Sequence, residues 1–187
     1  MKLVYGMGIN DSDSVTIVNG KIVSSYVYWK EMLRRCYDPK SLARAPTYVG
    51  CYVDPKWLSY TSFKEWFDKN HIDGYHLDKD LLFFGNKEYS ENTCIFVPPW
   101  LNSFVIEANA ARGKYMLGVY LKKQTGRFAA MCSNPLTKKQ EHLGYFLTEI
   151  EAHNKWKEQK RQHIESLKVE LDSIDARLYV VLKNRYK

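Results

Sequence analysis

The fold of this chain is decided by the stretch Gly74-Tyr-His-Leu-Asp-Lys-Asp-Leu-Leu-Phe-Phe-Gly-Asn-Lys-Glu-Tyr-Ser-Glu-Asn-Thr-Cys-Ile-Phe-Val-Pro-Pro-Trp-Leu-Asn102. Its residue pattern predicts two strands joined across a turn, and then a helix. The predicted parts are, in chain order, a strand carrying His76, Asp78 and Asp80, a turn around Gly85-Asn86, a strand from Thr93 to Val97, and a helix carrying Asn102.

The polar side chains of this stretch are suited to binding a divalent cation. A one-metal phosphodiesterase holds the cation with a carboxylate and an amide or imidazole, and a general base activates water on the other side of the phosphate. Asp78 and Asn102 would supply hard oxygen ligands, which favour Mg²⁺ or Mn²⁺ over zinc. The layout is that of a one-metal nuclease site.

The composition indicates a folded protein without a membrane span. Of the 187 residues, 45% are apolar and 14% are aromatic, which is enough to form a buried core. No apolar run approaches the roughly 18 residues that a span needs, and residues 1–6 contain no signal-peptide-like apolar segment. We therefore expect a cytoplasmic protein with no membrane partner.

The chain has four widely separated cysteines and no C-x-x-C pair: Cys36, Cys51, Cys94 and Cys132. Without a secretory start, buried thiols are expected rather than disulfides. The alternative is a zinc site built from the first three cysteines with His71 or His76. Its spacing is not that of a standard zinc motif, so we do not expect structural zinc.

Positive charge is concentrated toward the C-terminal end of the chain. Residues 1–111 contain 12 Lys and Arg against 13 Asp and Glu, whereas residues 112–187 contain 16 against 8. Basic side chains favour a polyanion partner, because each contact with a phosphate releases condensed counterions. A solvated basic helix face is the other explanation. The change of character at Arg112 predicts two domains, 1–111 and 112–187.

An Asn-Gly turn and two helical patterns precede the deciding stretch. Asn19-Gly20 lies between β-branched runs and predicts a hairpin that pairs residues 15–18 with residues 21–28. A helix from Trp29 to Tyr37 would bury one face, formed by Trp29, Met32, Leu33 and Cys36. A second short helix would turn three aromatic residues inward: Phe63, Trp66 and Phe67.

Three short strands and a helical region are predicted after Arg112. The strands cover residues 115–121, 128–132 and 142–146, and basic turns separate them. Thr148, with an acidic residue three positions later, forms a capping-box pattern that starts a helix. Apolar residues then recur at spacings of three and four as far as Val181, in one long helix or with a break. The rest of the protein or a second copy must cover that face.

Residues 78–102 resemble the ββα-metal core of HNH endonucleases, especially the phage-encoded homing-type members. That family ends its first strand with an Asp-His pair, has an Asn before the second strand, and has an Asn or His on the helix. The resemblance implies that Asp78 and Asn102 bind the metal and that Asn92 orients the base. Lys79 stands where the catalytic His belongs.

A second resemblance rests on Gly118 to Tyr120, Gly126-Arg-Phe-Ala-Ala, His142-Leu-Gly-Tyr-Phe and Thr148-Glu-Ile-Glu-Ala-His. With these features, residues 113–160 resemble an APETALA2-type DNA-binding domain, which many phage HNH proteins carry after the nuclease. In that family a three-stranded sheet enters the major groove and a helix packs behind it. An unrelated small α+β domain is the alternative. The resemblance implies contacts to double-stranded DNA from Arg112, Lys114, Lys122, Lys123, Arg127, Lys138 and Lys139.

Three interpretations of the catalytic position remain open. In the first, Lys79 is functional: Asp78 and Asp80 favour its charged form, a poor base but a cation that could grip a phosphate. In the second, His76 supplies the imidazole, because residues two apart on a strand share a face and His76 would point with Asp78. In the third, catalysis is lost and the hairpin is a scaffold.

We therefore predict an α+β chain with a ββα-metal, HNH-like core, a three-stranded sheet with a helix, and a long C-terminal helix. The leading hypothesis is a metal-dependent DNA endonuclease of phage-encoded homing type that nicks DNA. The alternative is a catalytically inactive, HNH-derived protein that binds DNA or inhibits a host protein. A homodimer formed through the C-terminal helix is a third hypothesis, which predicts no salt-dependent DNA affinity.

Overall fold

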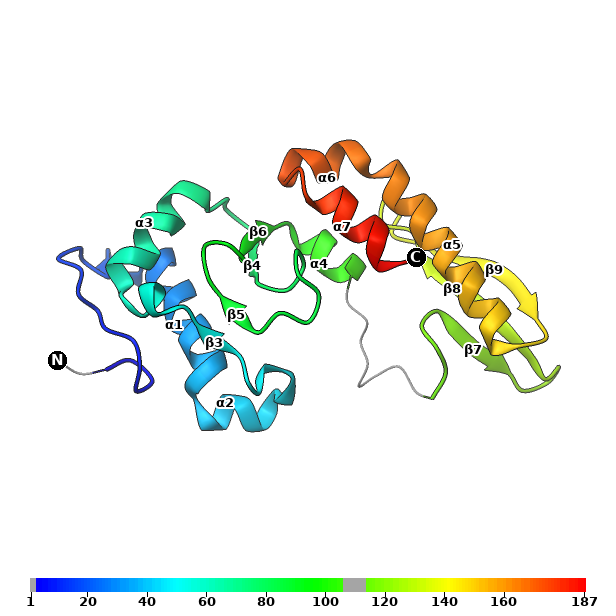
Figure 1. Cartoon of the computed structure of the whole chain (residues 1–187), viewed down its shortest axis with the longest axis horizontal. Coiled ribbons are helices and arrows are strands. Elements are labelled where there is room, and N and C mark those ends of the chain that lie inside the picture. The colour runs from blue at the N-terminus through cyan, green and yellow to red at the C-terminus, as the bar shows by residue number, and fades with distance from the viewer. Residues whose placement is uncertain (1–2, 106–113) are drawn as a thin grey trace. The chain divides into compact units, whose positions relative to one another are not determined.

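The computed structural model describes residues 3–105 and 114–187 and divides the chain into two compact units, Met1–Val97 and Pro98–Lys187 (Figure 1). Both units combine helices with short strands, so the predicted α+β class is confirmed. The division falls after Val97, whereas the change in charge suggested a boundary after residue 111. Within the described residues, no helix combines the length and the apolar surface that crossing a membrane requires.

The first unit opens with a short hairpin and a helix. Strands β1 (Ile17–Val18) and β2 (Lys21–Ile22) pair in antiparallel fashion around Asn19 and Gly20, whose φ angles are 50° and 73°. Positive φ angles at both positions are typical of a two-residue Asn-Gly turn, so the predicted hairpin is confirmed. Its second strand is short, however, because helix α1 (Ser24–Tyr37) follows almost at once.

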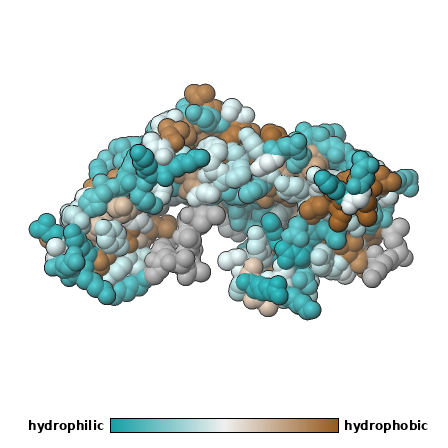
Figure 2. Space-filling model, turned by 180° about the vertical axis from the view of Figure 1, so that it is seen from behind, coloured by the Kyte–Doolittle hydropathy of each residue, from teal (hydrophilic) through white to brown (hydrophobic). Residues whose placement is uncertain are grey.

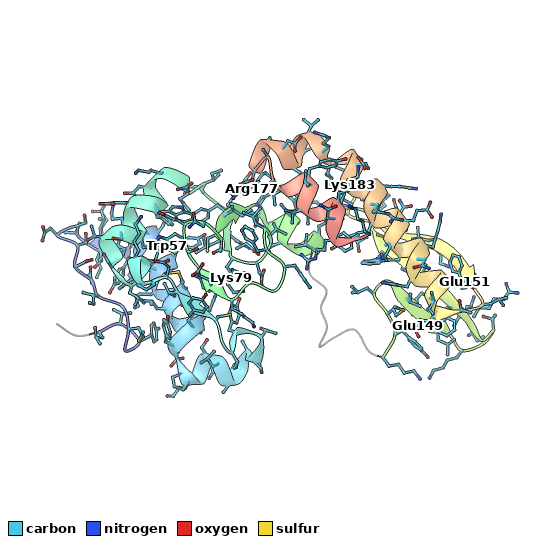
Figure 3. The ribbon with its side chains drawn as sticks, in the orientation of Figure 1. Trp57, Lys79, Glu149, Glu151, Arg177 and Lys183 are labelled. Atoms are coloured by element: carbon cyan, nitrogen blue, oxygen red, sulfur yellow. The ribbon has the colours of Figure 1, made fainter. Side chains whose placement is uncertain are left out.

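Tertiary contacts explain why residues 24–28 are helical rather than extended. Ser25 and Trp29 are about one helical turn apart, and both contact Tyr60. The hydroxyl oxygens of Ser25 and Tyr60 are 2.8 Å apart, and the ring centroids of Trp29 and Tyr60 are 5.3 Å apart. Trp29 also donates a hydrogen bond from Nε1 to the carbonyl of Trp57, labelled in Figure 3, at 2.8 Å. The strand predicted for these residues is therefore wrong.

The remaining helical elements of the first unit are short. They are α2 (Pro39–Arg44), the 3-10 turns η1 (Pro46–Tyr48) and η2 (Pro55–Leu58), and α3 (Tyr60–Asn70). Phe63 and Phe67 of α3 are buried and Trp66 is half-buried, which confirms the predicted inward face.

Two pairs of strands complete the first unit. Strands β3 (Tyr52–Val53) and β5 (Glu88–Tyr89) pair in parallel, and strands β4 (His76–Asp78) and β6 (Ile95–Val97) pair in antiparallel fashion. The β4–β6 pairing is the predicted one and is therefore confirmed, but both strands are shorter than predicted: Asp80 lies beyond β4 and Thr93 lies before β6. A turn at Gly85, where φ is 77°, lies between its two strands, as expected.

The second unit begins with helix α4 (Pro99–Val105), which carries Asn102 as predicted. An antiparallel sheet follows, in the order β7 (Val119–Lys122), β8 (Arg127–Ser133) and β9 (Gln140–Phe146). Helix α5 (Glu149–Ser166) then starts with the predicted capping box. The Thr148 side chain accepts a hydrogen bond from the N–H of Glu151. The carboxylate of Glu151, which is labelled in Figure 3, accepts one from the N–H of Thr148.

Helix α5 covers one face of the sheet (Figure 1). Trp156 of α5 is buried directly against Gly118, the residue before β7. On the same helix, the buried Lys160 fixes α4: its Nζ lies 3.4 Å from the centroid of the Phe104 ring and donates a hydrogen bond to the Phe104 carbonyl. The sheet and α4 are therefore both attached to α5.

Of the two predicted forms of the C-terminal helical region, one long helix or helices with a break, the structure has the second and consists of three helices. Helices α6 (Lys168–Ile174) and α7 (Leu178–Arg185) follow α5, with extended backbone at Asp175 between them. Helix α7 contacts α5, and Lys183, labelled in Figure 3, pairs with Glu165 at 2.6 Å. The fully buried residues of these helices include Leu171, Leu178 and Leu182. The apolar face is therefore covered within this chain, and no second copy is needed to cover it.

Replacing Gly118 by alanine tests the contact between α5 and the sheet. A Cβ at Gly118 would lie 2.0 Å from Cδ1 of Trp156, at a φ angle of 73°. We expect Gly118→Ala to lower the free energy of unfolding by about 3 kcal/mol or more, through overpacking and backbone strain together. Gly126→Ala is the matched control, because φ is 66° there and the added Cβ would meet nothing within 4 Å. Equal losses for the two variants in urea denaturation would contradict this packing.

Candidate functional site

Asp78, the expected metal ligand, ends strand β4 and holds the turn that follows. Its Oδ1 accepts hydrogen bonds from the backbone N–H groups of Asp80 at 2.9 Å and Leu81 at 2.7 Å. Burial and the neighbouring Asp80 carboxylate raise the pKa of Asp78. One carboxylate oxygen is therefore committed to the backbone, and the surroundings disfavour the ionised form that binds cations.

His76 lies at the exposed start of β4. Along the strand His76 is exposed, Leu77 is buried and Asp78 is half-buried. This alternation places His76 and Asp78 on one face, as the sequence predicts. Of the two expected proton-transfer residues, His76 is therefore the one that shares a face with the expected metal ligand.

Lys79, labelled in Figure 3, is buried beneath two aromatic rings. Its Nζ donates to the Asp80 carboxylate and to the Asn86 carbonyl, each at 2.9 Å, and lies within 6.0 Å of the ring centroids of Tyr48 and Tyr89. Burial by itself would lower the pKa of Lys79, but the Asp80 carboxylate outweighs that effect, so the pKa is raised. The side chain is an ammonium ion at neutral pH.

These contacts argue against the interpretation in which Lys79 acts on a phosphate. Only 8% of its side chain is exposed, and its hydrogen bonds go to the loop between β4 and β5. A general base must give up its proton near the working pH, which a raised lysine pKa prevents. The position of Lys79 therefore supports a structural role, in which it closes this loop from inside.

Asn86 holds the other side of the same loop, a role that the sequence did not reveal. Its Nδ2 donates to the carbonyls of Lys79 and Glu88, each at 2.7 Å. Asn92, the residue expected to orient the base, is exposed in the turn between β5 and β6. Asn102 is half-buried on α4 and belongs to the second unit. Of the expected nuclease residues, the structure places His76 and Asp78 together on one strand face.

The fit of the described residues to a resident metal ion is partial. No group of three or more His, Cys, Asp or Glu side chains among them is arranged to hold one. The thiols considered for zinc are buried, and burial raises the pKa of Cys36 and of Cys94 to about 12. His71 stacks on Phe67, with ring centroids 4.2 Å apart. On β4, the candidate ligands for a cation are the side chains of His76 and Asp78.

The second candidate surface is the face of the β7-β8-β9 sheet opposite α5, which we call the outer face. Cross-strand partners share a face, as do residues two apart on a strand. On the inner face, Cys132 meets His163 of α5, with Sγ 3.7 Å from Nδ1. The pairing register then gives the members of the outer face: Tyr120, Lys122, Arg127, Ala129, Met131, Ser133, Gln140, His142 and Tyr145.

Contacts between side chains hold the centre of the outer face in place. Lys122 reaches past the small Ala129 to Tyr145, with Nζ 3.2 Å from the hydroxyl oxygen and 4.8 Å from the ring centroid. His142 packs on the same tyrosine at 4.6 Å between ring centroids. Tyr120 and Tyr145 nevertheless remain 43% and 42% exposed. Both rings are thus accessible, and Tyr145 is also fixed by its neighbours.

Charge around the outer face is mostly positive. Residues 114–146, all of them described, contain six Lys and Arg and one acid, Glu141. The Glu141 carboxylate turns away toward α5, where it meets Nε2 of His163 at 2.9 Å. In the rear view of Figure 2, hydrophilic residues gather at the end of the second unit that carries the strands (left). A polyanion would therefore meet little repulsion at this face.

The residues expected to contact DNA surround the outer face. Lys122 and Arg127 lie on it, and the other described members of the set are exposed before β7 or in the turns on either side of β8. Those flanking residues are Lys114, Lys123, Lys138 and Lys139. Arg112 lies outside the described residues.

Sequence reasoning found the basic residues of the outer face and missed its aromatic ones. Tyr120 stands two residues before Lys122, a spacing that puts both on one face of a strand and could have revealed it. His142 could not be placed in this way. The register shifts at Ala130–Met131, so that His142 lies opposite Met131. Such a bulge reverses which side chains face outward and leaves no reliable mark in the sequence.

Lys79→Met tests the structural role of the buried ammonium. The variant keeps the apolar stem but leaves the Asn86 carbonyl without its donor, so we expect a loss of about 2 kcal/mol in the free energy of unfolding. Lys56→Met is the matched control, since Lys56 pairs with Glu91 at the same 2.9 Å but at an exposed position, where ion pairs contribute little. Urea denaturation measures both, and an unchanged stability of Lys79→Met would refute the structural role.

No protein-family model, no curated protein and no solved structure matches this chain. The functional assignment therefore rests on the chain's own residues. Its two candidate surfaces are the β4 face with His76 and Asp78 in the first unit, and the outer face of the sheet in the second.

Proposed function

We propose that this protein binds double-stranded DNA through the outer face of the β7-β8-β9 sheet. The observation that carries the proposal is the composition of that face. It bears two exposed tyrosines, a histidine and two basic side chains, with no carboxylate among the described residues of the strands that points outward. Helix α5 covers the inner face, so the outer one is the face left open to a ligand.

The chemistry of the outer face suits a DNA duplex. Lysine and arginine side chains bind phosphates and release condensed counterions, and an arginine such as Arg127 can donate two hydrogen bonds to the major-groove edge of guanine. Tyrosine and histidine add hydrogen bonds and apolar contact. The major groove is wide enough to admit β-strands. The resemblance of residues 113–160 to APETALA2-type domains agrees with this assignment.

Arg127→Ala tests the proposed interface. Fluorescence anisotropy with a labelled duplex, over a series of salt concentrations, should show affinity that falls with salt for the unmodified protein. Arg127→Ala should weaken binding about tenfold. Arg161→Ala, which removes the same type of side chain from an exposed position on α5, is the matched control and should bind as the unmodified protein does. Equal effects of the two substitutions, or an affinity indifferent to salt, would contradict the proposal.

A second candidate function is cleavage of the bound DNA by a metal-dependent endonuclease. It is favoured by one observation: His76 and Asp78 share a face of an antiparallel strand pair that is followed in sequence by a helix carrying Asn102. A bound Mg²⁺ or Mn²⁺ would stabilise charge on the leaving oxygen. The exposed imidazole of His76, rather than the buried Lys79, is the group suited to proton transfer.

Asp78→Asn tests for cleavage without unfolding the turn. An alanine would remove the acceptor for the N–H groups of Asp80 and Leu81, whereas the asparagine Oδ1 can still accept them. On supercoiled plasmid with Mg²⁺ or Mn²⁺, the endonuclease hypothesis expects nicking by the unmodified protein and its loss in Asp78→Asn and His76→Ala. DNA binding should remain in both variants.

The same experiment separates the two functions. Salt-dependent binding without nicking in either metal would eliminate the endonuclease and leave a DNA-binding protein built on a hairpin scaffold. Nicking that survives in Asp78→Asn would show that the β4 face does not carry the reaction.

A further inference from the structure

A single acid stands among the basic residues of the sheet in sequence, only two residues after Lys139. Glu141 is the one Asp or Glu among residues 114–146, which contain six Lys and Arg. A negative charge beside the proposed phosphate contacts weakens attraction for DNA unless it has another task. The contacts of its carboxylate indicate what that task is.

Three donors from two different elements converge on the Glu141 carboxylate. Asn134, at the start of the β8–β9 turn, donates from Nδ2 at 2.6 Å. From α5, Gln159 donates from Nε2 at 3.1 Å, and Nε2 of His163 lies at 2.9 Å. The hydrogen bond from Asn134, followed by the influence of His163, lowers the pKa of Glu141, so the side chain is ionised at neutral pH. Glu141 thus joins the turn to the helix.

Asn134 in turn closes the β8–β9 turn. Its Oδ1 accepts the N–H groups of Leu136 at 2.9 Å and Thr137 at 3.0 Å. Its backbone donates to the Lys139 carbonyl and accepts from the N–H of Lys138, each at 2.9 Å. The two lysines therefore sit on a turn whose shape depends on one asparagine, and Glu141 fixes the side chain of that asparagine.

The helix end of the connection is buried and fully paired. His163 is 7% exposed at its side chain, and its Nδ1 lies 3.7 Å from Sγ of Cys132. The Cys132 thiol also lies 3.8 Å from the Ser133 carbonyl, to which it can donate. Because an ionised carboxylate can only accept hydrogen bonds, His163 donates to Glu141 from Nε2. Turn and helix are therefore linked through the Glu141 carboxylate.

We propose that Glu141 is a positioning residue for DNA binding: it transmits the rigidity of α5 to the β8–β9 turn and so holds Lys138 and Lys139 in place for the phosphate backbone. The inference rests on the proposed function of the outer face. Ordering the turn before binding reduces the conformational entropy that two flexible lysines give up when they bind phosphate. The acid contributes more to affinity by this ordering than its charge takes away.

Simple electrostatics and the positioning role predict opposite effects of Glu141→Gln on DNA affinity. Simple electrostatics predicts tighter DNA binding, because a negative charge near the proposed phosphate contacts is removed. The positioning role predicts binding about three- to tenfold weaker. It also predicts that affinity depends less steeply on salt. The negative slope of log affinity against log salt should become shallower by about one, since each phosphate that a lysine no longer neutralises removes about 0.9 from its magnitude. Glu158→Gln on α5 is the matched control for charge, because Glu158 pairs with Lys155 away from the turn. It should bind DNA as the unmodified protein does, or slightly better.

Asn134→Ala breaks the same connection without any change of charge and should weaken binding to a similar degree. Combining Glu141→Gln with Lys138→Ala and Lys139→Ala completes the test: if Glu141 acts through the lysines, its substitution adds little once they are gone. Circular dichroism melts confirm that each variant is folded at the assay temperature.

Equal or tighter binding by Glu141→Gln, with salt-dependent binding by the unmodified protein intact, overturns the positioning role alone. Absence of salt-dependent binding by the unmodified protein overturns the DNA-binding function, and the positioning role with it.

Discussion

The contact between helix α5 and the inner face of the three-stranded sheet is the constraint on which the proposed function depends. Trp156 occupies the space that any side chain at position 118 would need, so the chain has a glycine there, with φ at 73°. Three strands alone do not bury an apolar face, and a helix packed across them supplies the missing layer. Once α5 covers the inner face, the side chains that alternate with the buried ones must point outward. Those side chains include two tyrosines, a histidine, a lysine and an arginine.

In the first unit, the buried charge of Lys79 determines the shape of the loop after β4. Lys79 occupies the position where the HNH resemblance expects a catalytic histidine, but its ammonium group is enclosed by a carboxylate, a carbonyl and two tyrosine rings. Removing a charge from water is costly unless partners of this kind replace the solvent. The loop after β4 supplies those partners and is shaped around them. The exposed side chain of His76 lies on the same strand face as Asp78, whose Oδ1 maintains the turn.

Local sequence rules predicted the parts of this fold that depend on neighbouring residues. The Asn19-Gly20 hairpin, the capping box at Thr148 and the strands of the second unit all follow from turn chemistry and short-range periodicity. Distant contacts decided the rest. The β-branched and aromatic residues before Trp29 favour a strand, but Tyr26, like Ser25 and Trp29, packs on Tyr60 from a helix. The parallel pair β3–β5 joins segments far apart in the chain, and the break at Asp175 lets α7 return to α5. For the candidate site, composition revealed the basic residues, whereas burial of Lys79 and the bulge between His142 and Gly144 could be seen only in three dimensions.

Hydroxyl-radical footprinting of the whole chain, with and without duplex DNA, tests the central claim most directly, because it reports which side chains the DNA covers. Tyr120 and Tyr145 are 43% and 42% exposed, and Tyr52 in the first unit is 48% exposed, so all three should react readily in the free protein. If the outer face binds DNA, the duplex should protect Tyr120 and Tyr145 and leave Tyr52 reactive. Saturating DNA that leaves Tyr120 and Tyr145 as reactive as before would contradict the account.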